Sequence, residues 1–122
     1  MNVVFRRGQA VDSLESLAFV IVEHIVLTVC FPKHTAFNHW NAEIRGFAKA
    51  IKRLDKGKKG RTNFNTALLK DVLNEVVFGE DEKEALIAII EASKGMEIGE
   101  TDQVDWKQVG LRIEEFSVEA LN

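Results

Sequence analysis

The feature that most constrains the fold is an apolar stripe between residues 37 and 54. Its members alternate at spacings of three and four residues: Phe37, Trp40, Ile44, Phe47, Ile51 and Leu54. An α-helix turns about once every 3.6 residues, so this spacing puts all of them on one helical face. The sequence therefore predicts an amphipathic helix over residues 37–55. We expect Trp40 and Phe47 to lie in the core that this helix shares with the one before it.

Four more helices are predicted from apolar periodicity combined with capping residues. They are expected near residues 13–31, 65–78, 82–94 and 106–120. Asp12, Asp81 and Asp105 each precede a helical pattern and are predicted N-caps, because an aspartate side chain can accept hydrogen bonds from the first free backbone N–H groups. Val104 and Val109 are placed to form a hydrophobic staple at the start of the last helix.

The predicted ends of three helices rest on proline and glycine. Pro32 should end the first helix, because a proline disfavours helical angles at the residue before it. Gly79 should follow the third helix in a left-handed conformation, which glycine adopts without steric cost, and Gly95 should end the fourth helix. The centre of the fourth helix, residues 85–90, is apolar on all sides, so we expect it to be deeply buried.

These patterns predict an all-α, compact bundle of four to five helices, up-and-down, with short loops. One proline in 122 residues favours helices over a turn-rich β-sandwich, and the length suits a single domain spanning 1–122. Residues 1–10 are expected to be extended or disordered, with a short strand at residues 2–5 as the alternative. Glu23 and His24 interrupt the longest apolar run, 17–31, which is also shorter than the roughly 20 residues of a membrane helix, so no membrane association is expected. The single cysteine, Cys30, suits a reducing compartment, and we expect a cytoplasmic protein.

Charge is unevenly distributed along the chain. Residues 49–61 carry a net charge of +6, whereas residues 75–122 carry −9. The basic side chains of the first segment are Lys49, Lys52, Arg53, Lys56, Lys58, Lys59 and Arg61. They are the candidate nucleic-acid-binding residues, because a run of lysines and arginines can follow phosphates. The same charges could instead pair with the acidic C-terminal half, within one chain or between two chains of a dimer.

Two groups of residues could carry acid–base or metal chemistry. Glu23 and His24 lie in the middle of the most apolar predicted helix, where burial would perturb both groups. A structural alternative is that Glu23 pairs with Arg45 across the turn between the first two helices. The second group is His34, His39 and Glu43. His39 and Glu43 are four residues apart and would share a helical face as two metal ligands can, but their spacing does not define a third ligand, for which His24 and His34 are the candidates.

The sequence thus favours a small non-catalytic interaction module that self-associates, as a homodimer, or binds another protein. A nucleic-acid-associated accessory protein using residues 49–61 is the first alternative. An enzyme dependent on a metal or on acid–base groups, centred on His24, His39 and Glu43, is the second. We expect no cofactor, no resident metal and no catalytic residue, and we interpret Cys30 as a buried apolar side chain.

Overall fold

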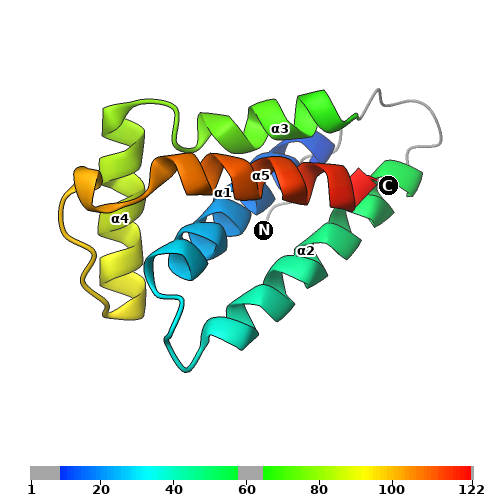
Figure 1. The fold of residues 1–122 in the computed structure, drawn as a ribbon. Coiled ribbons are helices and arrows are strands. Elements are labelled where there is room, and N and C mark those ends of the chain that lie inside the picture. Colours follow the sequence, from blue (N-terminus) through cyan, green and yellow to red (C-terminus); the bar gives the residue numbers. More distant parts are fainter. Residues whose placement is uncertain (1–8, 58–64, 122) are drawn as a thin grey trace.

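The computed structural model describes residues 9–57 and 65–121, with side chains described over 14–53 and 65–121. In these ranges the chain forms five α-helices and one 3-10 helix: α1 (Gln9–Cys30), α2 (Phe37–Gly57), α3 (Thr66–Glu75), α4 (Glu80–Lys94), η1 (Thr101–Gln103) and α5 (Trp106–Leu121) (Figure 1). The described part of the chain contains no strand. The predicted all-α helical bundle is confirmed.

The helices pack around α1 and α2, which form an antiparallel hairpin. α5 lies against both of these helices, and α3 lies beside α5 and against α1 (Figure 1). α4 runs across one end of the layer formed by α3 and α5 (Figure 1). The up-and-down order, in which each helix packs on its neighbour in sequence, therefore describes α1 and α2. It does not describe α3, whose principal partners are α1 and α5.

α1 is the central helix of the bundle. All residues from 21 to 28 are buried, including the polar side chains of Glu23, His24 and Thr28. The Thr28 hydroxyl donates a 2.8 Å hydrogen bond to the carbonyl oxygen of Ile25, which satisfies it inside the apolar segment. None of the helices in the described ranges combines the length and the apolarity that a membrane crossing requires.

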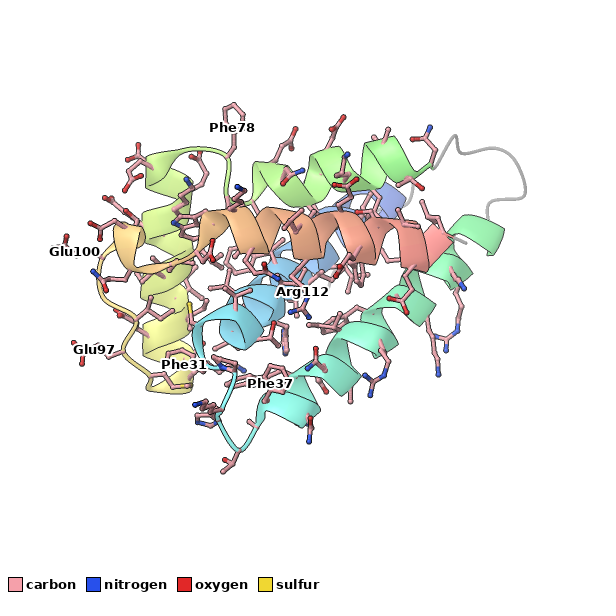
Figure 2. The ribbon with its side chains drawn as sticks, viewed as in Figure 1. Phe31, Phe37, Phe78, Glu97, Glu100 and Arg112 are labelled. Atoms are coloured by element: carbon pink, nitrogen blue, oxygen red, sulfur yellow. The ribbon has the colours of Figure 1, made fainter. Side chains whose placement is uncertain are left out.

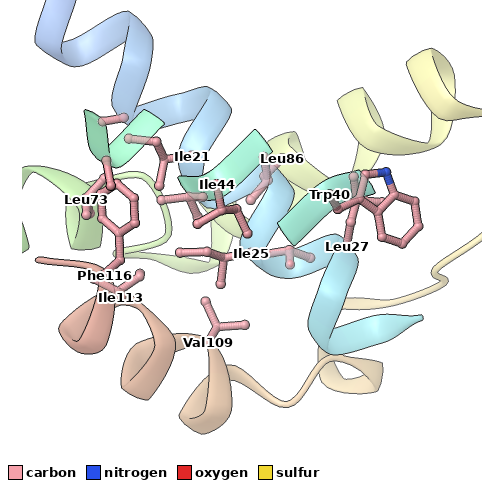
Figure 3. Packing of buried hydrophobic residues seen from close by; sticks show 14 of the residues in the cluster. Ile21, Ile25, Leu27, Trp40, Ile44, Leu73, Leu86, Val109, Ile113 and Phe116 are labelled. Atoms are coloured by element: carbon pink, nitrogen blue, oxygen red, sulfur yellow. The ribbon is translucent and has the colours of Figure 1, made fainter. Parts of the chain in front are cut away.

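All five helices contribute side chains to one hydrophobic core (Figure 3). The residues labelled there are Ile21, Ile25, Leu27, Trp40, Ile44, Leu73, Leu86, Val109, Ile113 and Phe116. Trp40 is buried as predicted, with 5% of its surface exposed. Phe47 is half-buried, so its predicted place in the core is confirmed only in part.

The predicted deep burial of the fourth helix is wrong. α4 buries Leu86, Ile87 and Ile90, whereas Ala88 is exposed and Ile89 keeps 45% of its surface in contact with solvent. The physical reason is its position at the end of the bundle, where it covers the core with one face only (Figure 1). An apolar segment is enclosed on all sides only where helices surround it, and in this bundle that position belongs to α1.

Two of the predicted N-caps are wrong and one is confirmed. α1 begins at Gln9, so Asp12 lies inside the helix, and its side chain is outside the described residues. Asp81 lies in the first turn of α4, because Gly79 is the N-cap and its carbonyl oxygen accepts from the Lys83 N–H at 3.0 Å. Asp105 caps α5 by accepting a 3.1 Å hydrogen bond from the Gln108 N–H. Its neighbour Val104 is buried, as the predicted staple requires.

The predicted C-terminal glycines also have different outcomes. Gly95 ends α4 as predicted, and the structure shows it in the left-handed conformation, with φ +68°. Gly79 has an extended φ of −117°, because α4 starts directly after it and needs an N-cap there. α3 stops at Glu75 rather than at 78, and residues 76–78 form successive turns instead. Pro32 is confirmed as the limit of α1, which ends at Cys30.

The structure tests only part of the prediction that residues 1–10 are extended or disordered. Gln9 and Ala10, expected in an extended or disordered segment, are helical, because both residue types favour helix and no breaker separates them from α1. The rest of that segment, including the alternative strand at 2–5, lies outside the described residues.

Candidate functional site

The outer side of α5 exposes apolar residues among carboxylates. The core side of this helix is formed by Val109, Ile113 and Phe116, all of which are buried. On the opposite side Leu111 and Val118 are 51% and 43% exposed, and they are seven residues apart, so they share one face.

Acidic side chains surround this apolar pair. A shallow depression on the surface of α5 is lined by Gln108, Leu111, Glu114, Glu115, Val118 and Glu119. We call Leu111, Val118 and these three glutamates the α5 outer face. It is a continuous surface on which apolar area is bordered by negative charge.

Four basic side chains form a stripe along the neighbouring helix α2. Arg45, Lys49, Lys52 and Arg53 are all exposed, and their spacing of four, seven and eight residues from the first places them on one side of the helix. We call these four residues the α2 basic stripe. None of these four side chains forms an ion pair or a hydrogen bond with another described residue. Of the other predicted basic residues, Lys56 lies in α2, but its side chain is not among the described ones. Lys58, Lys59 and Arg61 lie outside the described residues.

Arg45, the first residue of the α2 basic stripe, lines the same groove as Glu115 and Glu119 of α5. This groove has a volume of about 200 Å³ and is lined by Ile25, Asn41, Ile44, Arg45, Arg112, Glu115, Phe116 and Glu119. Arg112 lies between α5 and α2 (Figure 2), where its Nη2 donates to the Asn41 side-chain oxygen at 3.3 Å and its Nε lies 3.8 Å from Glu115. Arg112 therefore links the two helices, whereas Arg45 has no such partner among the described residues.

The structure brings together the three residues of the predicted enzyme site, His24, His39 and Glu43. Glu43 lies between the imidazoles: its Oε1 is 3.7 Å from Nε2 of buried His24, and its Oε2 is 3.7 Å from Nε2 of exposed His39. Nδ1 of His24 is 2.8 Å from the carbonyl oxygen of Val20, and because a carbonyl only accepts, that nitrogen carries the hydrogen. The ring of Phe47 meets His24 edge-on, with centroids 5.2 Å apart.

This arrangement differs from the predicted partners of Glu23 and His24. The suggested Glu23–Arg45 pair is wrong, because Glu23 forms no ion pair with any described residue and Arg45 lies beside the α2–α5 groove. Glu43 occupies the corresponding position opposite α1 and pairs with His24 instead. His39 and Glu43 do share a face as predicted, but in the described ranges no three His, Cys, Asp or Glu side chains are grouped in a way that could hold a metal ion.

Cys30 lies at the C-terminal end of α1 and packs against the core while remaining partly exposed. Burial raises the pKa of its thiol, which disfavours the reactive thiolate. The interpretation of Cys30 as a buried apolar side chain is therefore confirmed only in part, because the residue packs against the core but is half-buried.

Sequence reasoning did not single out the α5 outer face. A helical projection of residues 106–121 could have shown it, because Leu111 and Val118 fall off the face defined by Val109, Ile113 and Phe116. The role of Arg112 between two helices carried no such signal, since it depends on which helix α5 meets. Comparison of the chain with protein families, with curated proteins and with solved structures found no match.

Proposed function

We propose that this chain is a non-catalytic interaction module that self-associates through the α5 outer face. The observation that supports this proposal is the exposure of Leu111 and Val118 on the side of α5 that faces away from the core. Removing aliphatic surface from water is favourable by about 25 cal/mol per Å². Covering Leu111 and Val118 with a partner would therefore lower the free energy of the associated state. The surrounding carboxylates limit non-specific association and set the orientation of a partner.

Light scattering over a concentration series tests the proposal. The wild-type mass is expected to rise with concentration from that of one chain, 13.7 kDa, to that of two. The double variant Leu111→Gln/Val118→Gln should need on the order of thirtyfold more protein to associate, because it loses about 2 kcal/mol of apolar burial at two symmetric sites. Ile89→Gln, a change at an equally exposed residue of α4, is the matched control and should associate as the wild type does.

Circular dichroism of each variant would show that the helices remain formed. A wild-type chain that stays monomeric at millimolar concentration would refute self-association. Equal association of the double variant and the wild type would refute the assignment to the α5 outer face.

One observation favours a second function, that of a nucleic-acid-associated accessory protein. Lys49, Lys52 and Arg53 of the α2 basic stripe are exposed and form no ion pair with a described residue, so their charges are available to phosphates. Fluorescence anisotropy with labelled single- and double-stranded oligonucleotides would test it. Binding that weakens steeply with salt, and that is reduced in Lys49→Gln/Lys52→Gln, would support it, whereas the absence of binding at low salt would exclude it.

A further inference from the structure

A second copy of this chain carries a surface whose charge is complementary to that of the α5 outer face. We propose that the α2 basic stripe of a second copy covers the acidic side of the α5 outer face, so that two chains pack around a two-fold axis between α2 and α5. This inference rests on the proposed self-association and adds to it a specific contact. The observation that supports it is that two surfaces of opposite charge lie on neighbouring helices.

The two surfaces of opposite charge lie on neighbouring helices. α2 and α5 pack side by side, and their C-terminal ends approach each other (Figure 1). Arg45 of the basic stripe and Glu115 and Glu119 of the α5 outer face line the same groove between the two helices. The α2 basic stripe therefore lies on the helix next to α5, and at Arg45 it borders the same groove as the acidic side chains of α5.

Among the described residues, no ion pair joins the α2 basic stripe to the α5 outer face. Neither Lys49, Lys52 and Arg53 on α2 nor Glu114 and Glu119 on α5 form an ion pair with any described residue. Only Glu115 has such a partner on this surface, Arg112 at 3.8 Å on its own helix. Neutralisation of the basic stripe by the acidic helix of the same chain, the alternative raised by the charge distribution, is thus not made by direct contacts between described residues.

The arrangement of charge also fits the symmetry of a two-fold dimer. The interface of a two-fold dimer uses the same surface of both chains, so that surface must be complementary to itself. A positive row beside a negative row meets this condition, because rotation by half a turn about an axis between them places each row against its opposite. Two chains that approached with α2 against α2 would instead oppose like charges, which disfavours that arrangement.

The apolar and the charged parts of these surfaces can contribute to the same contact. Leu111 and Val118 supply apolar area to be covered, and the long aliphatic stems of the lysines in the α2 basic stripe can lie along such area while their ammonium groups reach the carboxylates around it. Each dimer would contain this contact twice. Association should therefore weaken as salt is added, since exposed charges are screened over about 8–10 Å at physiological ionic strength.

An exchange of charges between two variants tests the proposal. The acidic-side variant is Glu115→Lys/Glu119→Lys, and the basic-side variant is Lys49→Glu/Lys52→Glu. Each alone should raise the dimer dissociation constant by on the order of tenfold or more, because like charges then face each other at both symmetric contacts. An equimolar mixture should recover dimer, since the altered α5 of one variant meets the altered α2 of the other. With one variant labelled with ¹⁵N, native mass spectrometry identifies that dimer as the heterodimer by its mass.

The matched control carries the same change of charge elsewhere. Glu97 and Glu100 project from the loop that precedes α5, away from α2 (Figure 2), and both are exposed. Glu97→Lys/Glu100→Lys should dimerise as the wild type does. If the control is weakened to the same extent, net charge rather than this contact governs association, and the proposal is overturned.

The outcomes separate the two proposals. A monomeric wild type would overturn self-association and this contact together. Dimers that survive both charge variants but are lost in Leu111→Gln/Val118→Gln would overturn this contact and leave the proposed function intact. Folded variants that each lose the dimer but do not recover it on mixing would likewise show that α2 and α5 do not meet across the interface.

Discussion

Two glycines in exposed positions should respond in opposite directions to the same substitution. Gly46 lies within α2, and an added Cβ would meet no atom within 4 Å. Replacing it by alanine therefore adds no clash and removes the entropic cost of fixing a glycine in a helix. From helix propensities alone, Gly46→Ala should stabilise the fold by about 0.8–1 kcal/mol.

Gly95 provides the contrast, because space around it is equally open but its backbone is left-handed. An added Cβ would again meet nothing within 4 Å, yet φ is +68°. A residue with a Cβ pays about 1–2 kcal/mol for that conformation. The alternative is to rearrange the end of α4, where the Gly95 N–H donates to the carbonyl oxygen of Glu91 at 3.0 Å. Gly95→Ala should therefore destabilise the fold by about 1–2 kcal/mol.

Urea unfolding followed by tryptophan fluorescence measures both changes, with the slope of the transition checked for constancy. The two variants should move the midpoint in opposite directions from the wild type. A shift in the same direction for both would refute the reasoning, because the two sites differ in backbone conformation and not in the space available to a methyl group.

Three further predictions concern Trp40, Glu91 and His39. Trp40→Ala should lower the free energy of unfolding by about 3–5 kcal/mol, because the ring is 5% exposed; a loss near zero in urea would contradict its place in the core. The N–H groups of Gly99 and Ile98 hold the pKa of the Glu91 carboxyl below its ordinary value, so these contacts stabilise the fold above about pH 4.5 and are lost as the pH falls through the lowered pKa. The stability advantage of the wild type over Glu91→Gln should therefore disappear in acid, and an advantage that grows in acid would reverse the assigned sign. His39→Ala should change the free energy of unfolding by less than about 0.5 kcal/mol, since His39 is 70% exposed. A decrease of several degrees in the midpoint of thermal unfolding would show instead that its pair with Glu43 stabilises the fold.

Local sequence patterns determined the helices and several of their limits. The spacing of apolar residues between 37 and 54 is a property of one helix and needs no partner to be recognised. Asp105 and Gly95 act within one turn of the backbone, so their roles could also be predicted from neighbouring residues. Gly79 could not, because a glycine between two helices can serve the end of one or the start of the next. Which helix it served depended on how soon α4 began.

The tertiary structure decided which apolar helix is enclosed and which polar residues meet. Residues 21–28 are all buried although three of them are polar, whereas residues 85–90 are all apolar but buried on one face only, because α1 lies at the centre of the bundle and α4 at its end. Glu43 rather than Arg45 faces His24 because the rotation of α2 against α1 is set by packing, which single-helix periodicity leaves open by a residue or two. The proximity of the α2 basic stripe to the acidic side of α5 depends on contacts between residues far apart in sequence, and such contacts follow from how all the helices fill the core together.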